Sequence, residues 1–283
     1  MSSHRLLLVT TQVASLTCHT APDLLSPSLS DKRSWSSPVG PDACPRSPSF
    51  RRRAVVVLTA LADSTVADDA WGTKLEFVAL VNTPGLTSLQ LKFNHETLRL
   101  RIELADDVLF EDVLDAVGRR RFASTIERYI VGLEENPIAS RMDRLPLRVV
   151  GDGITPRYQD REPGYTTLHG RPSLAAIATA VAEAPEVTEH RFRSNIAVDD
   201  LDPWKEQSWI GHKLRIGDVE FEVAAPVTRC LATHAHPRTG KRDLPIMKTL
   251  LELIPTERPT FAIMMTADRG GWIRVGDKVE LSN

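Results

Sequence analysis

The sequence predicts an α+β protein that is mostly β, with a C-terminal β-barrel of short strands and a few peripheral helices. Apolar residues alternate with charged ones through residues 213–223, and a Gly-Asp pair supplies the turn of a β-hairpin. Residues 273–281 repeat that pattern and predict a second hairpin, and two such hairpins suit a barrel. Helical spacing of apolar residues marks two longer stretches, 115–133 and 174–182.

The composition is that of an ordinary globular protein. The chain has 283 residues, 42% hydrophobic and 25% charged, which is enough for one large or two small domains. The formal net charge of −2 gives no basic excess, so nucleic acid is not an expected partner. No apolar run approaches the ~20 residues of a membrane span. Cys18 and Cys44 lie in the N-terminal leader, so we expect no disulfide framework and a cytoplasmic protein.

Residues 1–53 form a leader that we expect to be disordered. The leader is crowded with serine and proline and ends in three arginines, and this composition buries too little apolar area to offset the entropy of ordering. Two targeting interpretations remain open. Residues 6–16 resemble a short signal-peptide apolar region, and the bias towards arginine and serine fits an organelle transit peptide. The third interpretation is a simple tail, or a start codon assigned too far upstream.

Residues 54–145 predict a strand-rich region followed by a helix. We expect short strands at 54–58 and 75–81, and a hairpin formed by 86–93 and 98–104. The period then changes, and the amphipathic helix over 115–133 follows. The run of three arginines inside that helix predicts a solvated helix face, not a binding patch.

Residues 146–283 are predicted to form the barrel domain. A strand over 166–169 ends at a turn, and Pro172 and Ser173 then open the helix that runs to about residue 182. Ser173 lies near the N-terminus of that helix, where free backbone N–H groups attract anions.

Cys230 stands at the end of the predicted strand 219–223, in the loop that continues to Asp243. Pro226 is expected to stop regular ladder pairing before this cysteine. Arg229 is adjacent, and an adjacent cation favours the thiolate, which is both a nucleophile and a soft metal ligand. The alternative is that Cys230 is a small buried hydrophobic residue, as most free cysteines are.

Six short stretches of this half occur in a fixed order. They are 191–199, 204–209, 216–218, 229–230, 237–240 and 273–277. Their order and spacing resemble those of the MOSC domain, which is named for the C-terminal domain of molybdenum cofactor sulfurases. The same domain occurs in the mitochondrial amidoxime reducing component and its bacterial relatives. The resemblance covers residues 146–281 and implies a MOSC-type barrel, preceded by a partial β-barrel/α region at 54–145 and the leader at 1–53.

The resemblance implies a molybdenum–pyranopterin cofactor (Mo-molybdopterin). In the reductase branch of the family the protein adds one cysteine sulfur to the metal, which makes Cys230 the expected catalytic and metal-binding residue. Arg229 is the expected thiolate stabiliser and cofactor contact, and Arg193 and Asn195 match the family's Arg-x-Asn pair. Arginine suits phosphate through its planar donor fork, and asparagine can both donate to and accept from a pterin edge. For Arg193 the alternative is a surface salt bridge.

Two more cofactor contacts follow from the same resemblance. The family places hydroxyl residues on the pterin phosphate near the start of the first barrel helix, which indicates Ser173, and this chain has His169 close to that point. The family's front domain begins with a Tyr-Pro-Val-Lys-Ser-like turn and an Asp-Arg motif that also contact the phosphate. Neither has a counterpart in residues 1–70, so the expected front domain is incomplete.

The implied function is a molybdenum-dependent oxidoreductase that reduces small N-oxygenated substrates. Electrons would come from an external electron-transfer protein, because no flavin, haem or iron–sulfur motif is visible. Sulfur transfer is the competing function: Cys230 would carry a persulfide supplied by a separate cysteine desulfurase, and pyridoxal phosphate is not expected in this chain. Two further interpretations stay open, a degenerate, non-catalytic MOSC domain and a zinc site formed by Cys230, His234 and His236.

Overall fold

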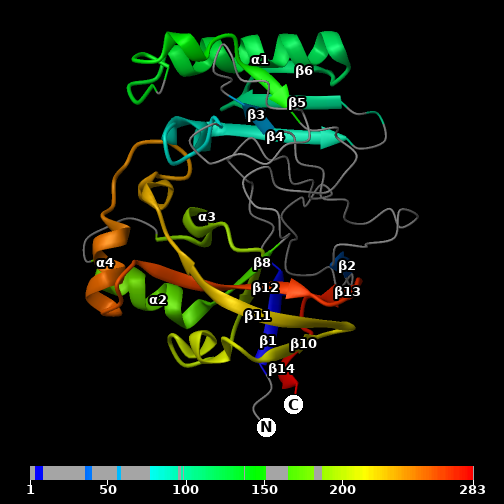
Figure 1. The fold of residues 1–283 in the computed structure, drawn as a ribbon, viewed down its shortest axis with the longest axis vertical. Coiled ribbons are helices and arrows are strands. Elements are labelled where there is room, and N and C mark those ends of the chain that lie inside the picture. Colours follow the sequence, from blue (N-terminus) through cyan, green and yellow to red (C-terminus); the bar gives the residue numbers. More distant parts are fainter. Residues whose placement is uncertain are drawn as a thin grey trace.

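The protein consists of a β-barrel and a smaller layered part that carries helix α1 (Figure 1). The computed structural model describes residues 4–8, 36–39, 56–58, 77–94, 97, 99–136, 138–150, 165–181 and 187–282. Among the described residues, more lie in strands than in helices, which confirms the predicted α+β, mostly β fold class.

Seven strands close the barrel in the order β1-β14-β10-β11-β12-β8-β9. Their bounds are β1 His4–Leu8, β8 Thr166–Gly170, β9 Ile196–Val198, β10 Lys213–Ile216, β11 Val219–Thr228, β12 Thr260–Ala267 and β14 Lys278–Ser282. Neighbouring strands are antiparallel except β8 and β9, which are parallel. A closed sheet leaves no unpaired edge, and its interior is filled by side chains.

The predicted hairpin at 213–223 is confirmed as β10 and β11. Leu214 and Ile216 are buried while their neighbours are exposed, and the apolar residues of β11 point inward in the same alternating way. Gly217 makes the turn with a φ of +54°, and a Cβ there would clash with the carboxylate of Asp277. Alternation therefore gave the correct register, because a slip by one residue would turn the acidic residues into the core.

Strand β11 continues past Pro226, where the sequence predicted that pairing would stop. Pro226 stays in register with Ile263 of β12, and irregularities of register lie on both sides of it. Such bulges leave a residue unpaired and so accommodate the missing N–H of proline. The consequence for function is that β11 carries the chain in extended form to Thr228, directly before Arg229.

The predicted second hairpin at 273–281 is wrong. Strand β13, Gly271–Arg274, pairs with β2, Ser36–Val39, whereas β14 pairs with β1 and β10. A turn does form, with the Asp277 N–H donating to the Arg274 carbonyl. However, the carboxylate of Asp277 accepts the N–H of Arg274 at 2.6 Å, so that N–H is not available to a ladder with β14.

Two segments of the predicted disordered leader are strands. Residues 4–8 form β1, which pairs with β14 on one side and β9 on the other, and β2 pairs with β13. Without β1 the sheet would expose unpaired N–H and C=O groups on both flanking strands, which is the physical reason for this pairing. The remainder of 1–53, including most of the possible signal-peptide region at 6–16, lies outside the described residues.

The smaller part contains a three-stranded antiparallel sheet covered by a helix (Figure 1). Its strands are β4 Leu89–Asn94, β5 Arg99–Leu104 and β6 Asp107–Val113, and α1 runs over Ala116–Val131. Asp115 caps α1 by accepting the N–H groups of Val117 and Gly118. A core of sheet and helix residues, which we call the front core, includes the fully buried Phe122, Ile126 and Ile130. The predicted hairpin and helix are confirmed; β6 was not predicted.

The predicted strand at 75–81 is wrong for its described part. Residues 80–82 form a turn, and Pro84–Ser88 forms the 3₁₀-helix η2 before β4 begins. Asn82 explains the difference, because its side chain accepts the N–H of Ala79 and donates to the carbonyl of Phe77. Such local bonds offer the backbone an alternative to strand pairing.

Strand β3, Val56–Leu58, agrees with the predicted strand at 54–58 and pairs with β7, Arg148–Val150. Leu147 and Val149 pack into the front core. The predicted domain boundary near residue 146 stays a prediction.

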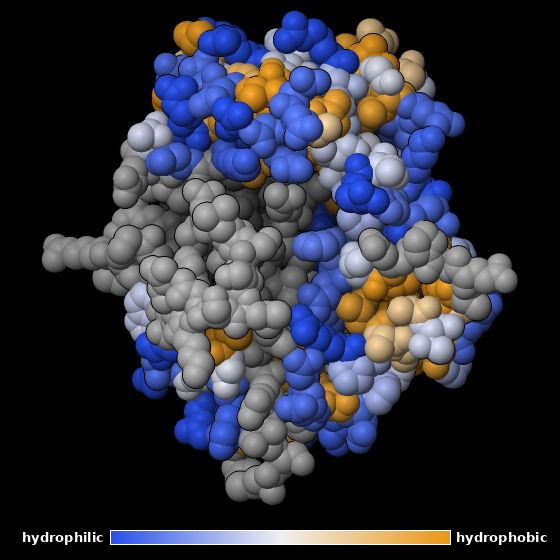
Figure 2. All heavy atoms as spheres, turned by 180° about the vertical axis from the view of Figure 1, so that it is seen from behind, coloured by the Kyte–Doolittle hydropathy of each residue, from blue (hydrophilic) through white to orange (hydrophobic). Residues whose placement is uncertain are grey.

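The barrel carries three short helices: α2 Arg171–Ala180, α3 Glu189–Phe192 and α4 Ile246–Leu253. Short 3₁₀-helices occur at η3 Met142–Arg144, η4 Lys205–Trp209 and η5 Leu231–His234. Leu174, Ile177 and Val181 are buried, which agrees with the helical spacing of apolar residues predicted for 174–182. Figure 2 shows apolar surface gathered on the side where Figure 1 places α2 and α4. Within the described part of the chain, no helix has the length and apolar character to cross a membrane.

We predict that the barrel depends on β1. Deleting residues 1–8 removes the partner of both β9 and β14, and the thermal midpoint should fall by about 5 °C or more because two sheet edges are left unpaired. Deleting residues 1–3 is the matched control and should leave the midpoint unchanged. Equal midpoints for the two truncations in differential scanning calorimetry would show that the barrel does not depend on β1.

Candidate functional site

Arg229 follows β11 directly, and its guanidinium lies over a pair of phenylalanine rings whose centroids are 4.2 Å apart. Its guanidinium carbon is 5.5 Å from the ring centroid of Phe192 and 5.4 Å from that of Phe261. Nε donates to the Phe261 carbonyl at 2.8 Å and Nη1 to the Phe192 carbonyl at 3.0 Å. The third nitrogen, Nη2, is buried and has no hydrogen-bond partner among the described residues. The arrangement fixes the guanidinium and leaves one nitrogen, with its N–H donors, for a ligand.

The surroundings of Arg229 disfavour its positive charge. Burial, followed by the positive charge of Arg193, lowers the pKa of Arg229 to about 9, while Cys230 acts in the opposite direction. Burying a charge is costly unless it is paired. A bound anion would therefore restore the pKa of Arg229 towards its ordinary value.

His169, at the end of β8, completes the polar cluster. Its side chain is fully buried, its ring lies 5.2 Å from that of Phe261, and neither ring nitrogen has a hydrogen-bond partner among the described residues. Its Nε2 is 3.9 Å from Glu189 Oε1, which instead accepts from Arg171 at 2.7 Å. Burial, followed by the charges of Arg229 and Arg171, lowers the pKa of His169 to about 3, so the imidazole is neutral at physiological pH.

Arg193 and Asn195 lie on the segment between α3 and β9. Arg193 adopts left-handed backbone geometry, with a φ of +52°, which ends α3 and turns the chain into β9. Asn195 Oδ1 accepts the backbone N–H of Thr167 at 2.9 Å and its hydroxyl at 3.0 Å. The carbonyl side of this amide therefore ties β9 to β8, and only its Nδ2 side is left outside this pairing.

Ser173 is not arranged as the anion-binding hydroxyl that the sequence predicted. It is fully buried, donates to Glu206 Oε2 at 2.9 Å and accepts the N–H of Trp204 at 2.7 Å. Burial raises the pKa of Glu206, and hydrogen bonds from Ser173 and the Gly170 backbone act in the opposite direction. The chain's own carboxyl group thus occupies the N-terminus of α2, where the sequence indicated an external anion. The sequence analysis did not identify Glu206, whose only sequence signal is its position between Trp204 and Trp209.

Cys230 directly precedes η5 and lies against the smaller part of the molecule. Its side chain is half-buried and packs on the front core, and its carbonyl accepts the N–H and the hydroxyl of Thr233. The thiol is free. Among the predicted site residues, Arg193 and His169 interact electrostatically with Arg229, and Cys230 is its chain neighbour.

The loop after Cys230 is anchored by Arg191, a second residue that the sequence analysis did not single out. Its side chain is fully buried and grips Asp243 with two bonds, Nη1 to Oδ1 at 2.7 Å and Nη2 to Oδ2 at 2.8 Å. Nη1 also donates to the carbonyls of His234 and Ala235. A bidentate pair of this kind adds geometric specificity as well as energy.

The zinc site considered from the sequence is not supported. His234 Nε2 accepts the N–H of Met247 at 3.2 Å, and His236 Nδ1 accepts the N–H groups of Arg238 and Thr239. Both rings are thus engaged in shaping the loop. No group of three histidine, cysteine, aspartate or glutamate side chains that could hold a metal occurs among the described residues.

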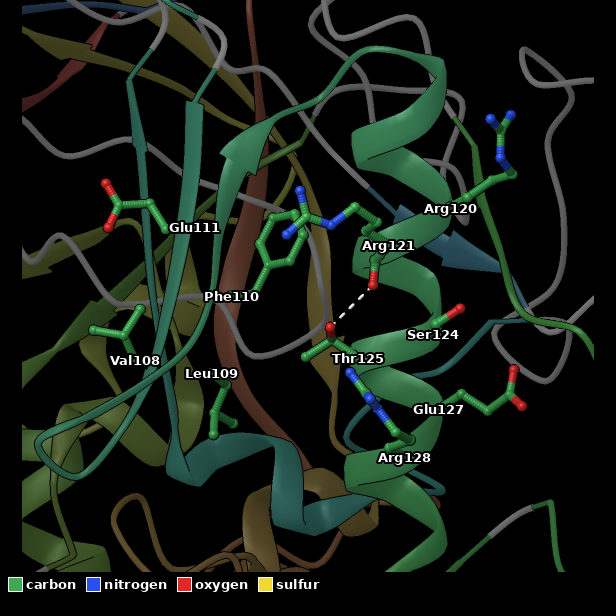
Figure 3. Close-up of a pocket in the computed structure, with 10 residues that line it drawn as sticks. All are labelled: Val108, Leu109, Phe110, Glu111, Arg120, Arg121, Ser124, Thr125, Glu127 and Arg128. Carbon is green, nitrogen blue, oxygen red and sulfur yellow. Dashed lines mark hydrogen bonds between the residues drawn. The ribbon is translucent and has the colours of Figure 1, made fainter.

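A groove of about 510 Å³ lies between β6 and α1 (Figure 3). It is lined by Val108, Leu109, Phe110, Glu111, Arg120, Arg121, Ser124, Thr125, Glu127 and Arg128. Arg120 and Arg121 are exposed, as the predicted solvated helix face requires, and Arg121 pairs with Asp112. None of the predicted site residues lines this groove.

Comparison with known proteins links the barrel to one family. Residues 166–280 match the model of the MOSC domain. A molybdenum cofactor sulfurase from Caenorhabditis elegans is 33% identical over 95 residues, which is 32% of this chain and 13% of the relative. Mitochondrial amidoxime-reducing component 1 from Danio rerio is 30% identical over 100 residues, 33% of this chain and 30% of the relative. The chain thus spans less than a third of the length of these relatives.

Two solved structures show weaker likeness. One, described as a hypothetical protein, has a TM-score of 0.32 and 16% identity over 44% of this chain and 56% of its own. The YUAD protein from Bacillus subtilis has a TM-score of 0.27 and 10% identity over 80% of this chain and 95% of its own.

We predict that His169 makes the cofactor-free protein lose stability as the pH falls. The ordinary pKa of 6.5 applies to the unfolded chain and about 3 to the folded one, so between these values only the unfolded chain takes up the proton. The stability is fully present above pH 6.5, and this residue removes about 1.4 kcal/mol per pH unit below it. His169→Leu should abolish that contribution in urea unfolding measured from pH 7.5 to 5.

The exposed His212 provides the matched control, and His212→Leu should keep the pH dependence of the wild type. A His169→Leu curve parallel to that of the wild type over this range would contradict a buried, neutral His169.

Proposed function

Residues 166–280 of this chain form a MOSC domain, and from that premise we propose that the protein binds a molybdenum–pyranopterin cofactor and acts as an oxidoreductase. The observation that carries the proposal is the buried, under-bonded cluster of Arg229 and His169. Arg229 Nη2 and both ring nitrogens of His169 are buried polar atoms without hydrogen-bond partners among the described residues. Native proteins rarely leave such atoms unsatisfied, so they call for a polar ligand.

The residues present fit an anionic group at this cluster. Arg229, through Nη2, would donate to a phosphate oxygen, and the charge of Arg193 acts at the same place. Neutral His169 would donate from one nitrogen and accept at the other. Ser173 is left out of the proposed contacts because its hydroxyl is bonded to Glu206 and Trp204. Asn195 would offer its Nδ2 group, since Oδ1 is bonded to Thr167.

Cys230 is the proposed protein ligand of the metal. It is free, half-buried and adjacent to Arg229, and a thiolate is a soft ligand suited to such a metal. When bound, the cofactor supplies the oxygen-atom and electron chemistry. The chain's own part is to hold the phosphate through Arg229 and Arg193, and to present the sulfur of Cys230 from a fixed loop.

The proposed substrates are small N-oxygenated molecules, in line with the name of the amidoxime-reducing relative. An external electron-transfer protein would supply electrons, and we place the protein in the cytoplasm, where Cys230 stays reduced. Sulfur transfer is the second candidate function, favoured by the names of the sulfurase relatives. In that case Cys230 would carry a persulfide from a separate cysteine desulfurase.

We predict that Cys230→Ser separates these functions. The variant should retain the pterin, because the phosphate contacts lie on other residues, but reduction of N-hydroxylated substrates should fall to background since an alcohol is a poor, hard replacement for a thiolate. X-ray absorption should show one sulfur fewer around molybdenum.

Cys230→Ala is the companion variant and should behave in the same way. Unchanged activity and unchanged sulfur coordination in Cys230→Ser would exclude metal ligation. Uptake of labelled persulfide sulfur by the wild type in the absence of molybdenum would support the sulfur-carrier function instead.

A further inference from the structure

We propose that Arg242 and Glu135 form a clamp that positions Cys230, so that the smaller part of the molecule controls access to the thiol on the barrel loop. The proposal rests on the proposed function in one respect, which is the assignment of Cys230 as the reactive residue. The hydrogen bonds that form the clamp do not depend on that assignment.

Arg242 uses each of its guanidinium nitrogens on a different group. Nε donates to both carboxylate oxygens of Glu135, at 3.0 and 2.8 Å, just beyond the end of α1. Nη2 donates to the carbonyl of Val81 at 3.0 Å, and Nη1 to the carbonyl of Leu231 at 2.5 Å. One side chain therefore joins two points of the smaller part to the residue that follows Cys230.

The backbone around Arg242 is itself held in place. Arg242 forms a β-bridge with Ala235, whose carbonyl accepts from the buried Arg191. The barrel thus fixes the base of the clamp, and the clamp reaches across to the smaller part.

Two other contacts bring the same loop against the smaller part. The Thr87 hydroxyl donates to the His236 carbonyl at 3.0 Å. Gly240 has a φ of +69°, and a Cβ on it would lie 2.5 Å from the Cα of Gly85. The loop therefore rests directly on the segment around η2, with no room for a side chain at that point.

Cys230 is consequently held from both directions along the chain. On its N-terminal side Arg229 is bonded to the carbonyls of Phe261 and Phe192. On its C-terminal side the carbonyl of Leu231 is bonded to Arg242. The thiol between them packs on the front core. Releasing Leu231 while Arg229 stays fixed should let the thiol turn away from that core into solvent.

The thermodynamic and kinetic consequences of the clamp differ, which makes the proposal testable. Glu135 is 46% exposed in the ion pair, and exposed pairs contribute little to stability. Glu135→Gln should therefore leave the melting temperature nearly unchanged. Access to the Cys230 thiol should change strongly, because local opening depends on the bonds that hold the segment.

The test measures the rate at which iodoacetamide alkylates Cys230 in the full chain, expressed without molybdate so that no metal blocks the sulfur. Site-resolved mass spectrometry separates Cys230 from Cys18 and Cys44. Rates are compared at the high-pH plateau, where the thiol is ionised and the rate reports access. Arg242→Gln and Glu135→Gln should each raise the rate about fivefold or more, and Arg242→Lys should fall between them and the wild type.

The control is Arg215→Gln, which removes an Arg–Glu pair on β10 and β14, where Arg215 Nη2 lies 2.6 Å from a glutamate, Glu280, about as exposed as Glu135. It should leave the rate within about twofold of the wild type. If Arg242→Gln does not fold, Glu135→Gln decides alone.

A rate within twofold of the wild type, or a lower one, in Glu135→Gln and in any folded Arg242→Gln would overturn the proposal. An equal rise in Arg215→Gln would also overturn it, because the effect would then be global. The assay requires no cofactor, so failure of the molybdenum assignment leaves this result interpretable.

Discussion

The site depends on the guanidinium of Arg229, which lies against the packed rings of Phe192 and Phe261. Arg229 can hold this place because two backbone carbonyls take two of its nitrogens, and its third nitrogen remains a donor without a partner among the described residues. The pKa of Arg229, lowered to about 9, expresses the cost of this burial. In the proposed function, this cation and the neutral, buried His169, which interact electrostatically, would bind an anion away from solvent.

The two parts of the molecule divide the work around this cation. The barrel contains Arg229, His169, Arg193 and the ion pair of Arg191 with Asp243. Its strand β11 leads to Cys230, which lies where the barrel loop meets the smaller part. The smaller part supplies the surface on which the thiol packs. Changes in the contacts between the Cys230 loop and the smaller part should therefore affect the site even when the barrel is intact.

Sequence patterns predicted the parts of the fold that follow from alternation and helical period. The β10–β11 hairpin, β4–β5 and α1 have clear patterns, because each buries one face and exposes the other. Two of the failures, the strand expected at 75–81 and the hairpin expected at 273–281, came from side chains that bond to local backbone. Asn82 folds back on residues 77–79, and Asp277 captures the N–H of Arg274, and neither effect changes the hydrophobic pattern.

The candidate site could be predicted in its residue types but not in its connections. Arg229 and His169 were expected, yet their lack of partners depends on packing against Phe261, which the sequence does not reveal. Ser173 was expected on a phosphate, whereas the acid that occupies it, Glu206, comes from a segment 33 residues away. Long-range pairs such as Arg191–Asp243 leave no periodic signal at all.

The most direct test of the central claim is elemental analysis of the purified full chain for molybdenum. The chain is expressed in a host that loads molybdenum cofactor into another molybdenum enzyme under the same conditions. We expect close to one molybdenum per chain, together with pterin released on denaturation. Arg193→Ala should lose most of that metal, while Arg215→Ala on the barrel surface should retain it. Absence of molybdenum from the wild-type chain in such a host would contradict the proposed cofactor site.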